Sequence, residues 1–233
     1  MLSALPLRKK ENVQKGSHIV IAIDGPAASG KSSVARELAR RLGFIYVNSG
    51  AMYRAVTWHL LQQRIDPHDR FAIEQQIGRL QIRCDLHDRE SRILINEADP
   101  GDHLRDDAVN ESVSIVSSLS RVRERLVEKM REYARDHDLV MEGRDIGSVV
   151  FPKTPYKFYI DASPEIRLQR RTAQGQRDEI ARRDQADSSR RTSPLVIAKD
   201  SEVIDTSKLT IREVVDEIVR QLGTKGLSID SRT

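Results

Sequence analysis

The pattern of apolar and polar positions predicts alternating strands and helices at the start of the chain. His18–Asp24 is a short β-branched, apolar run that ends at a Gly-Pro turn, as is typical of a buried parallel strand. Apolar residues then recur at helical spacing over Ser32–Leu42, and Gly43 follows as a glycine cap. Phe44–Val47 predicts a second strand and Gly50–Gln63 a second helix. This alternation favours a doubly wound α/β fold.

The pattern changes between residues 66 and 105. After a short helical stretch, Leu80–Leu86 and Arg92–Asn96 alternate apolar with polar residues, as half-buried strands do. Turn-forming residues lie at the ends of both segments. We therefore expect a small antiparallel insertion at about 66–105.

The remainder of the chain returns to helices and buried strands. Ser163 is a natural N-cap, and the Pro164 that follows it is a natural first helical residue. With the two strands at the start of the chain, these segments predict a parallel five-stranded sheet flanked by helices. Helices are expected at Asp106–His137, from Ser163 onward and at Thr210–Leu222, and strands at Asp138–Glu142, Tyr156–Asp161 and Ser201–Asp205.

Composition narrows the class of protein. The 233 residues are 38% hydrophobic and 32% charged, which fits one globular domain with one sizeable insertion. The net charge is only +4 and bases are interleaved with acids, so we expect no nucleic-acid partner. No apolar run approaches the roughly 20 residues of a spanning helix, so we expect no membrane partner.

The single cysteine and the N-terminal segment indicate the cellular compartment of the protein. Cys84 cannot form an intramolecular disulfide, which favours a reducing compartment. Met1–Ser17 contains four basic residues but no apolar core of signal-peptide length, and predicts a disordered tail. We expect a cytoplasmic monomer.

The segment Gly25–Ser32 carries the first chemical signal. It matches the phosphate-binding pattern G-x-x-x-x-G-K-[ST] and lies between a predicted strand and a predicted helix, as the pattern requires. Lys31 can reach the β- and γ-phosphates of a nucleotide, and the Ser32 hydroxyl can bind Mg²⁺. The predicted ATP-binding residues are Gly25, Pro26, Ala27, Ala28, Ser29, Gly30, Lys31, Ser32 and Ser33, the last of which could instead simply continue the helix.

Other motifs distinguish among the classes of protein that carry this phosphate-binding loop, the P-loop. A GTPase would carry D-x-x-G and N-K-x-D elements, but no Asp stands three residues before a Gly and no Asn precedes Lys. A motor ATPase would end an apolar strand in an acid pair, whereas Leu139–Glu142 runs into Gly-Arg-Asp. Small-molecule kinases remain as the favoured class. One alternative is a non-catalytic ATP-binding module, and within the kinases the acceptor could be any of several small nucleotides.

A kinase must bring two anionic substrates together, which requires cationic side chains around both. Asn48–Arg54 follows the second strand, and there Ser49 and Arg54 can reach an acceptor phosphate. Glu142–Gly147 also lies at a strand end. There, Arg144 suits a phosphate and Asp145 suits a hydrogen-bonding ligand.

These blocks together resemble the bacterial cytidylate kinase family from Ile19 to about Leu222. The shared segments are Asp24–Ser32, Ser49–Arg54, Glu142–Pro152 and Arg183–Arg190. The resemblance implies a nucleoside monophosphate kinase fold with a P-loop core at 18–48 and 106–233, a nucleotide-acceptor region at 49–105 and a helical lid at about 171–191. It implies ATP and CMP or dCMP as substrates, with Mg²⁺.

The resemblance also implies roles for individual residues. Cytosine presents an amino donor beside two acceptors, which Asp145 with Arg123 can match. Glu142 departs from the aspartate of many relatives, and the arginine that meets the γ-phosphate could be Arg182, Arg183 or Arg190. The implied catalytic residues are Lys31, Arg144, Arg183 and Arg190; the implied CMP ligands are Ser49, Arg54 and Arg144 for the phosphate, Ser114, Arg123 and Asp145 for the base, and Arg183 and Asp187 for the ribose.

Overall fold

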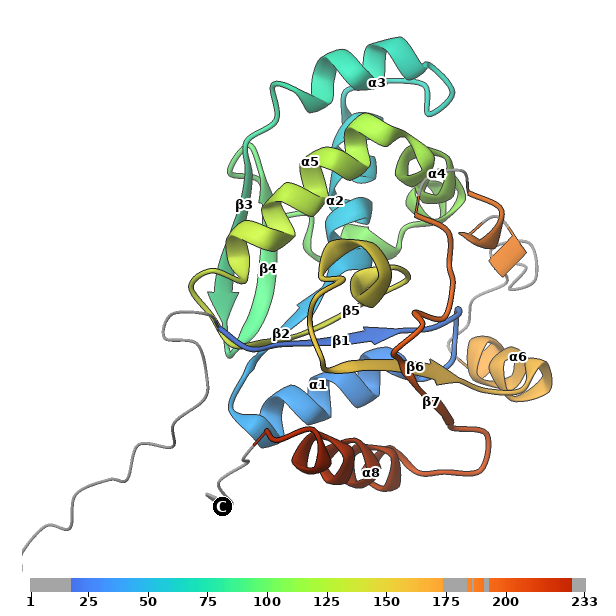
Figure 1. Cartoon of the computed structure of the whole chain (residues 1–233). Helices are drawn as coiled ribbons and strands as arrows, with labels where there is room; N and C mark the ends of the chain where they lie inside the picture. Colours follow the sequence, from blue (N-terminus) through green and yellow to red (C-terminus); the bar gives the residue numbers. More distant parts are fainter. Residues whose placement is uncertain (1–17, 174–183, 186, 191–192, 228–233) are drawn as a thin grey trace, which may run out of the picture.

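A computed structural model describes residues 18–173, 184–185, 187–190 and 193–227 (Figure 1). The strands are β1 (Val20–Asp24), β2 (Ile45–Asn48), β3 (Ile82–His87), β4 (Glu90–Ile95), β5 (Leu139–Gly143), β6 (Lys157–Asp161) and β7 (Glu202–Asp205). The helices are α1 (Lys31–Leu42), α2 (Ser49–Gln62), α3 (Arg70–Ile77), α4 (Asp107–Ser118), α5 (Ser120–Tyr133), α6 (Pro164–Ala173) and α8 (Ile211–Thr224). Two short helical turns are η1 (Gly101–Arg105) and η2 (Ile146–Val150).

The described strands form one sheet in the order β3-β4-β2-β5-β1-β6-β7. The five strands from β2 to β7 in this order are parallel, which confirms the predicted five-stranded core. The predicted antiparallel insertion is also confirmed, because β3 and β4 pair antiparallel. The sequence did not predict that β4 joins the edge of the same sheet, beside β2, through the pair Tyr46 and Glu90. The sheet therefore has seven strands rather than five.

Side chains of β1 alternate between two apolar layers, as a strand covered on both faces requires. Ile21 and Ile23 pack in one cluster with buried residues of α1 and α8. Val20 and Ala22 pack in the other cluster, with α2, α5 and the β3–β4 hairpin. Figure 1 shows α1 and α8 on one side of the sheet and α2 and α5 on the other.

Parallel strands place the loops that follow them at one edge of the sheet. β1 and β5 are neighbours in register, with Asp24 opposite Gly143. The loop after β1 carries the P-loop motif and the loop after β5 carries Arg144 and Asp145, so the fold brings two motifs 119 positions apart next to each other, as the hydrogen bond from Arg144 to Gly25 shows.

Some predicted features lie outside the described residues. They are the N-terminal tail 1–17 and, within the predicted lid, residues 174–183, 186 and 191–192, which include Arg182 and Arg183. Within the described ranges, no helix is both long and apolar enough to cross a membrane.

Candidate functional site

The P-loop curls tightly between β1 and α1. Gly25 has φ 154° and Gly30 has φ 92°, in a region of backbone space that favours glycine. A methyl group added to Gly25 would lie 2.1 Å from the Ile160 carbonyl oxygen, so a larger residue cannot fit without displacing backbone. Helix α1 begins at Lys31, and its first-turn amides therefore face the loop. Ser32 is half-buried and Ser33 is exposed on this turn.

Lys31 is buried, and its ammonium group donates a 2.9 Å hydrogen bond to the Pro26 carbonyl oxygen across the loop. Burial, reinforced by the nearby charge of Arg144, lowers the pKa of Lys31 to about 7. The loop thus holds a lysine whose charge is destabilised, which an anion placed beside it would relieve.

Helix α6 and neighbouring segments hold the P-loop from outside. Arg170 donates to the Ser29 carbonyl oxygen at 3.0 Å, and the Thr206 hydroxyl donates to the same oxygen at 2.8 Å. Asp184 accepts a hydrogen bond from the Ala27 amide at 3.1 Å and pairs with Arg167. A carboxylate therefore contacts an amide of the phosphate-binding motif.

A second cluster lies beyond β5, around the ion pair of Arg123 and Asp145. Both side chains are almost fully buried, at 3% and 4% exposure. Arg123 also donates to the Ser117 carbonyl oxygen at 3.1 Å and lies over the ring of Tyr53, 5.3 Å from its centroid. Burial raises the pKa of Tyr53 to about 12, and its hydroxyl has no hydrogen-bond partner among the described residues. Buried polar groups of this kind are typical of a ligand site.

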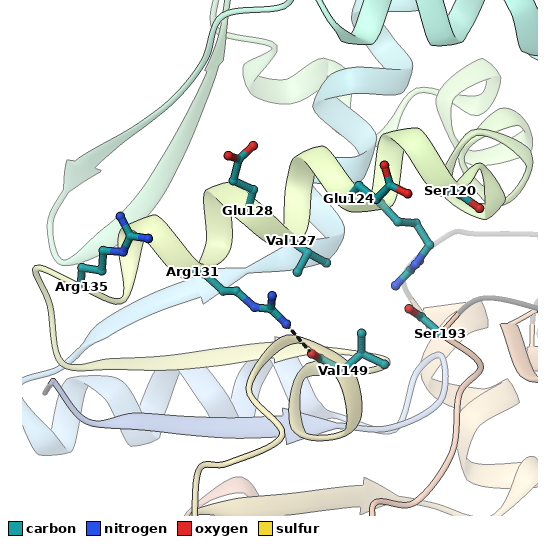
Figure 2. A pocket seen from close by; sticks show the side chains of 9 residues that line it. Ser120, Glu124, Val127, Glu128, Arg131, Arg135, Val149 and Ser193 are labelled. Carbon is teal, nitrogen blue, oxygen red and sulfur yellow. Dashed lines mark hydrogen bonds between the residues drawn. The ribbon is translucent and has the colours of Figure 1, made fainter.

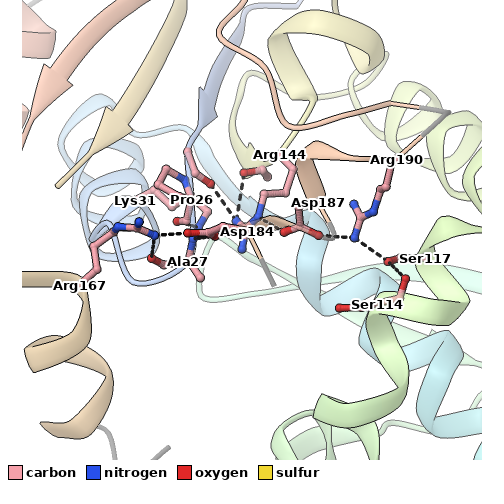
Figure 3. Close-up of polar contacts among 12 residues, drawn as sticks. Pro26, Ala27, Lys31, Ser114, Ser117, Arg144, Arg167, Asp184, Asp187 and Arg190 are labelled. Atoms are coloured by element: carbon pink, nitrogen blue, oxygen red, sulfur yellow. Dashed lines mark hydrogen bonds and ion pairs between the residues drawn. The ribbon is translucent and has the colours of Figure 1, made fainter. Parts of the chain in front are cut away.

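A chain of polar contacts joins the two clusters (Figure 3). Arg144 donates to the Gly25 carbonyl oxygen at 3.0 Å and to the Asp187 carboxylate at 2.8 Å. Asp187 also pairs with Arg190. Arg190 in turn donates to the Ser117 hydroxyl of α4 at 3.1 Å. The chain therefore runs from the P-loop through Asp187 and Arg190, in the described part of the predicted lid, to α4.

Helix α2 adds polar groups at its N-terminus. Asn48 caps the helix by accepting from the Ala51 amide at 3.0 Å. Ser49 is buried and donates to the Glu142 carbonyl oxygen at 2.7 Å. Arg54 is half-buried one turn further along, and its guanidinium would lie 3.3 Å from a methyl group at Gly50.

Glu142 is the penultimate residue of β5, and its carboxylate is buried. Tyr46 donates to it at 2.7 Å, and Asn48 donates to the Tyr46 hydroxyl at 3.3 Å. The longer glutamate side chain is thus held by a tyrosine of the neighbouring strand β2.

Asp24 lies at the end of β1 with 4% exposure. Its two carboxylate oxygens accept from the Ile146 amide at 2.8 Å and from the Gly147 amide at 2.7 Å. Burial raises the pKa of this carboxyl to about 6, and the two amides oppose that shift.

A cavity of about 440 Å³ runs along α5, and Arg123 is one of the residues that line it (Figure 2). Acidic and basic residues both line it, and Arg131 closes part of its wall by donating to the Val149 carbonyl oxygen at 2.9 Å. No P-loop residue lines this cavity. Of the Arg123–Asp145 pair, only Arg123 lines this cavity.

The structure brings together most of the residues singled out in the sequence. Arg144 joins the P-loop to Asp187, Asp187 pairs with Arg190, and Arg123 pairs with Asp145. Ser114 is half-buried on α4, where its carbonyl oxygen accepts from the Ser117 hydroxyl at 3.3 Å. Arg183 lies outside the described residues.

Sequence reasoning missed several residues that the structure places at the site. They are Asp24, Tyr53, Ser117, Arg167 and Asp184. Asp24, Tyr53 and Asp184 lie within the recognised blocks, so their position was a usable signal. Ser117 and Arg167 stand in ordinary helical stretches, where only the fold reveals what they contact.

The fold and the site together define a P-loop enzyme of the kind that handles phosphorylated small molecules. The cytidylate kinase family model matches residues 21–224. The cytidylate kinase of Mycobacterium leprae (strain Br4923) is 43% identical over 213 residues, covering 86% of this chain and 94% of the relative. That of Caldanaerobacter subterraneus subsp. tengcongensis is 39% identical over 221 residues, covering 89% and 97%.

The chain therefore belongs to the cytidylate kinase family. The predicted family is confirmed, and the chain is a phosphotransferase.

Proposed function

We propose that the protein transfers the γ-phosphoryl group of ATP to CMP or dCMP, giving ADP and the corresponding diphosphate. The observation that carries this proposal is the chain of contacts through Arg144, which touches the P-loop on one side and the lid acid Asp187 on the other. A group so placed lies between a donor site and an acceptor site. Two anionic substrates that react with each other need such a shared cation.

The donor half is the P-loop. Its backbone amides and Lys31 bind the triphosphate, since the loop from Gly25 to Ser32 offers converging N–H groups and a buried ammonium. Phosphate oxygens next to Lys31 restore its positive charge. We assign Lys31 to charge neutralisation of the transferring group.

The acceptor half is built from side chains of several elements. Ser49, Arg54 and Arg144 bind the acceptor phosphate, while Ser114, Arg123 and Asp145 read the base. Asp145 accepts from the cytosine amino group, and Arg123 donates to ring acceptors. The ion pair between Arg123 and Asp145 orients both groups before the ligand arrives.

The lid completes the site. Asp187 and Arg183 are assigned to the ribose. Arg190, which is largely buried and whose pKa is lowered by burial, is assigned to the phosphates. Closing the lid over both substrates excludes water that would otherwise hydrolyse ATP.

The protein offers Mg²⁺ only a partial site. Ser32 offers one hydroxyl ligand at the start of α1, and among the described residues no cluster of acids and histidines could hold a metal alone. A hard cation that keeps waters and binds through substrate phosphates needs only such a partial protein site. Bound there, Mg²⁺ would neutralise charge on the phosphate oxygens.

The reaction is an in-line displacement. An oxygen of the CMP phosphate attacks the γ-phosphorus, the new O–P bond forms, and the bond to the β,γ-bridging oxygen breaks as ADP leaves. The attacking oxygen is already anionic, so no residue has to remove a proton from it. The residues of the site position the two substrates and neutralise the charge of their phosphates.

A coupled assay of ADP release tests the proposal with ATP and CMP, dCMP, UMP, AMP or GMP as acceptor. We expect release that depends on CMP or dCMP. Absence of any acceptor-dependent release would contradict a kinase, and a purine preference would contradict the assignment of Asp145 and Arg123 to the base.

A further inference from the structure

The buried carboxylate of Asp24 is in contact with the loop that follows β5. Its oxygens accept from two successive amides, those of Ile146 at 2.8 Å and Gly147 at 2.7 Å, although 122 and 123 positions separate the partners in sequence. The two amides come directly after Arg144 and Asp145. Asp24 thus holds the backbone on the C-terminal side of both residues.

The space around this contact is closely packed. A methyl group on Gly147 would lie 3.3 Å from an Asp24 carboxylate oxygen and 3.2 Å from the Lys157 side chain. The loop therefore approaches β1 as closely as glycine allows.

Burying a carboxylate is costly, and a strand end can be completed without one. Asp24 recovers part of that cost through its two amides, which gives the contact a strict geometry. Since Asp24 also directly precedes Gly25, the same residue joins the start of the P-loop to the Arg144–Asp145 segment.

We propose that Asp24 is a positioning residue that fixes Arg144 and Asp145 relative to the P-loop and thereby sets the selectivity for cytosine over uracil. The inference rests on the proposed roles of Arg144 and Asp145. Asp24 itself touches no substrate in this account. It acts through the orientation of the loop that reads the acceptor.

Asp24→Asn in the full chain tests the inference, because it keeps the size of the side chain and turns one acceptor into a donor that faces an amide. We expect kcat/KM for CMP to fall about tenfold or more, since a lost hydrogen bond to a charged group is worth roughly 1.5–3 kcal/mol. The ratio of kcat/KM for CMP to that for UMP should fall severalfold. The KM for ATP should stay within about twofold, because among the described residues the Asp24 carboxylate accepts hydrogen bonds from the loop after β5.

Asp161→Asn is the matched control. Asp161 ends the neighbouring strand β6, and its carboxylate accepts from its own neighbour, the Ala162 amide, at 2.8 Å. This variant should keep the CMP-to-UMP ratio of the wild type. A loss of kcat/KM in Asp24→Asn that is equal for CMP and UMP would overturn the positioning role, because a merely structural defect affects both acceptors alike.

A second variant covers the case in which Asp24→Asn does not fold. Gly147→Ala disturbs the same contact from the loop side and should lower the CMP-to-UMP ratio as well. An unchanged ratio in a folded Gly147→Ala protein would overturn the inference.

Asp145→Asn separates this inference from the proposed function. If Asp145→Asn lowers the ratio and Asp24→Asn does not, the base assignment holds and the positioning role is wrong. If Asp145→Asn leaves the ratio unchanged, both are wrong. In the double variant, Asp24→Asn should lower the ratio no further, since it acts through Asp145.

Discussion

The P-loop and the Arg123–Asp145 cluster are built in opposite ways. The P-loop is a continuous segment, Gly25–Ser32, whose chemistry comes from backbone amides and one buried lysine. The Arg123–Asp145 cluster combines side chains of α2, α5 and the loop after β5, with α4 contributing the Ser117 carbonyl oxygen. A backbone site tolerates change at most side chains but not at its glycines. A side-chain site depends on each group and on what orients it.

This difference determines which of the two regions can distinguish one base from another. Every nucleoside triphosphate carries the same phosphates, so a backbone loop can bind them without reading the base. The acceptor base must be told from others, which requires donors and acceptors in fixed positions. Substitutions in the P-loop and in the Arg123–Asp145 cluster should therefore differ in their effects on ATP binding, on turnover and on the choice of acceptor.

Lys31→Met should have the largest effect. It removes the charge that neutralises the transferring group, so we expect kcat to fall by about 10²–10³ with little change in the CMP-to-UMP ratio. Steady-state kinetics at saturating ATP measure this. Lys157→Met is the matched control, since Lys157 is also buried and donates to a proline carbonyl five residues earlier, at 2.7 Å, but pairs with Asp200. A near-normal kcat in Lys31→Met would contradict the donor assignment.

Asp145→Asn should act on the other half. It removes the negative charge and exchanges one acceptor oxygen for an amino donor, which leaves Arg123 buried without its ion-pair partner. We expect kcat/KM for CMP to fall about 10²-fold and that for UMP to fall much less, so each acceptor serves as the control for the other. Equal losses for CMP and UMP would rule out a base-reading role for Asp145.

The donor half should also show a pH signature. Lys31 has a pKa of about 7 in the free protein, lowered by burial and Arg144, and bound phosphates must raise it. The free protein therefore loses this proton above pH 7 while the complex keeps it, so ATP binding should take up close to one proton at pH 8. The Kd for ATP should rise by up to about tenfold per pH unit from there.

Titration calorimetry in two buffers of different ionisation enthalpy measures that proton uptake. CMP binding, which does not involve Lys31, should lack it. Proton uptake that persists in Lys31→Met would show that another group is responsible.

Ser49→Ala should have the smallest effect. The substitution removes a 2.7 Å hydrogen bond to the Glu142 carbonyl oxygen and one contact to the acceptor phosphate. A single hydrogen bond of about 1 kcal/mol predicts a roughly fivefold rise in the KM for CMP. Ser118→Ala, at an exposed serine that donates to the Ile115 carbonyl oxygen, is the control. No change in the KM for CMP would remove Ser49 from the acceptor site.

The contrast also explains how much the sequence could predict. The P-loop could be predicted from the sequence because its spacing, its glycines and its flanking elements all lie within one short segment. The strands and helices could be predicted because burial of one or both faces leaves a periodic pattern of apolar residues. The pairing of β4 with the sheet edge was not, since Tyr46 and Glu90 form one long-range contact that no local pattern requires.

The acceptor cluster was accessible in part. Arg123 and Asp145 were expected through family resemblance, and their burial as a pair adds the physical reason for it. Ser117 could not be found, because a serine in an amphipathic helix is ordinary until the fold places Arg190 and Arg123 on it. Asp24 stands within a recognised block of the sequence. Its two hydrogen-bond donors could not be predicted, because the amides of Ile146 and Gly147 belong to the loop after β5, far along the chain.

Separate equilibrium binding of ATP and of CMP to two variants tests the division into two halves most directly. We expect Lys31→Met to weaken ATP binding and to leave the Kd for CMP within about twofold. We expect Asp145→Asn to weaken CMP binding and to leave the Kd for ATP within about twofold. If each substitution weakened both ligands equally, the donor and acceptor sites would not be the separately built regions described here.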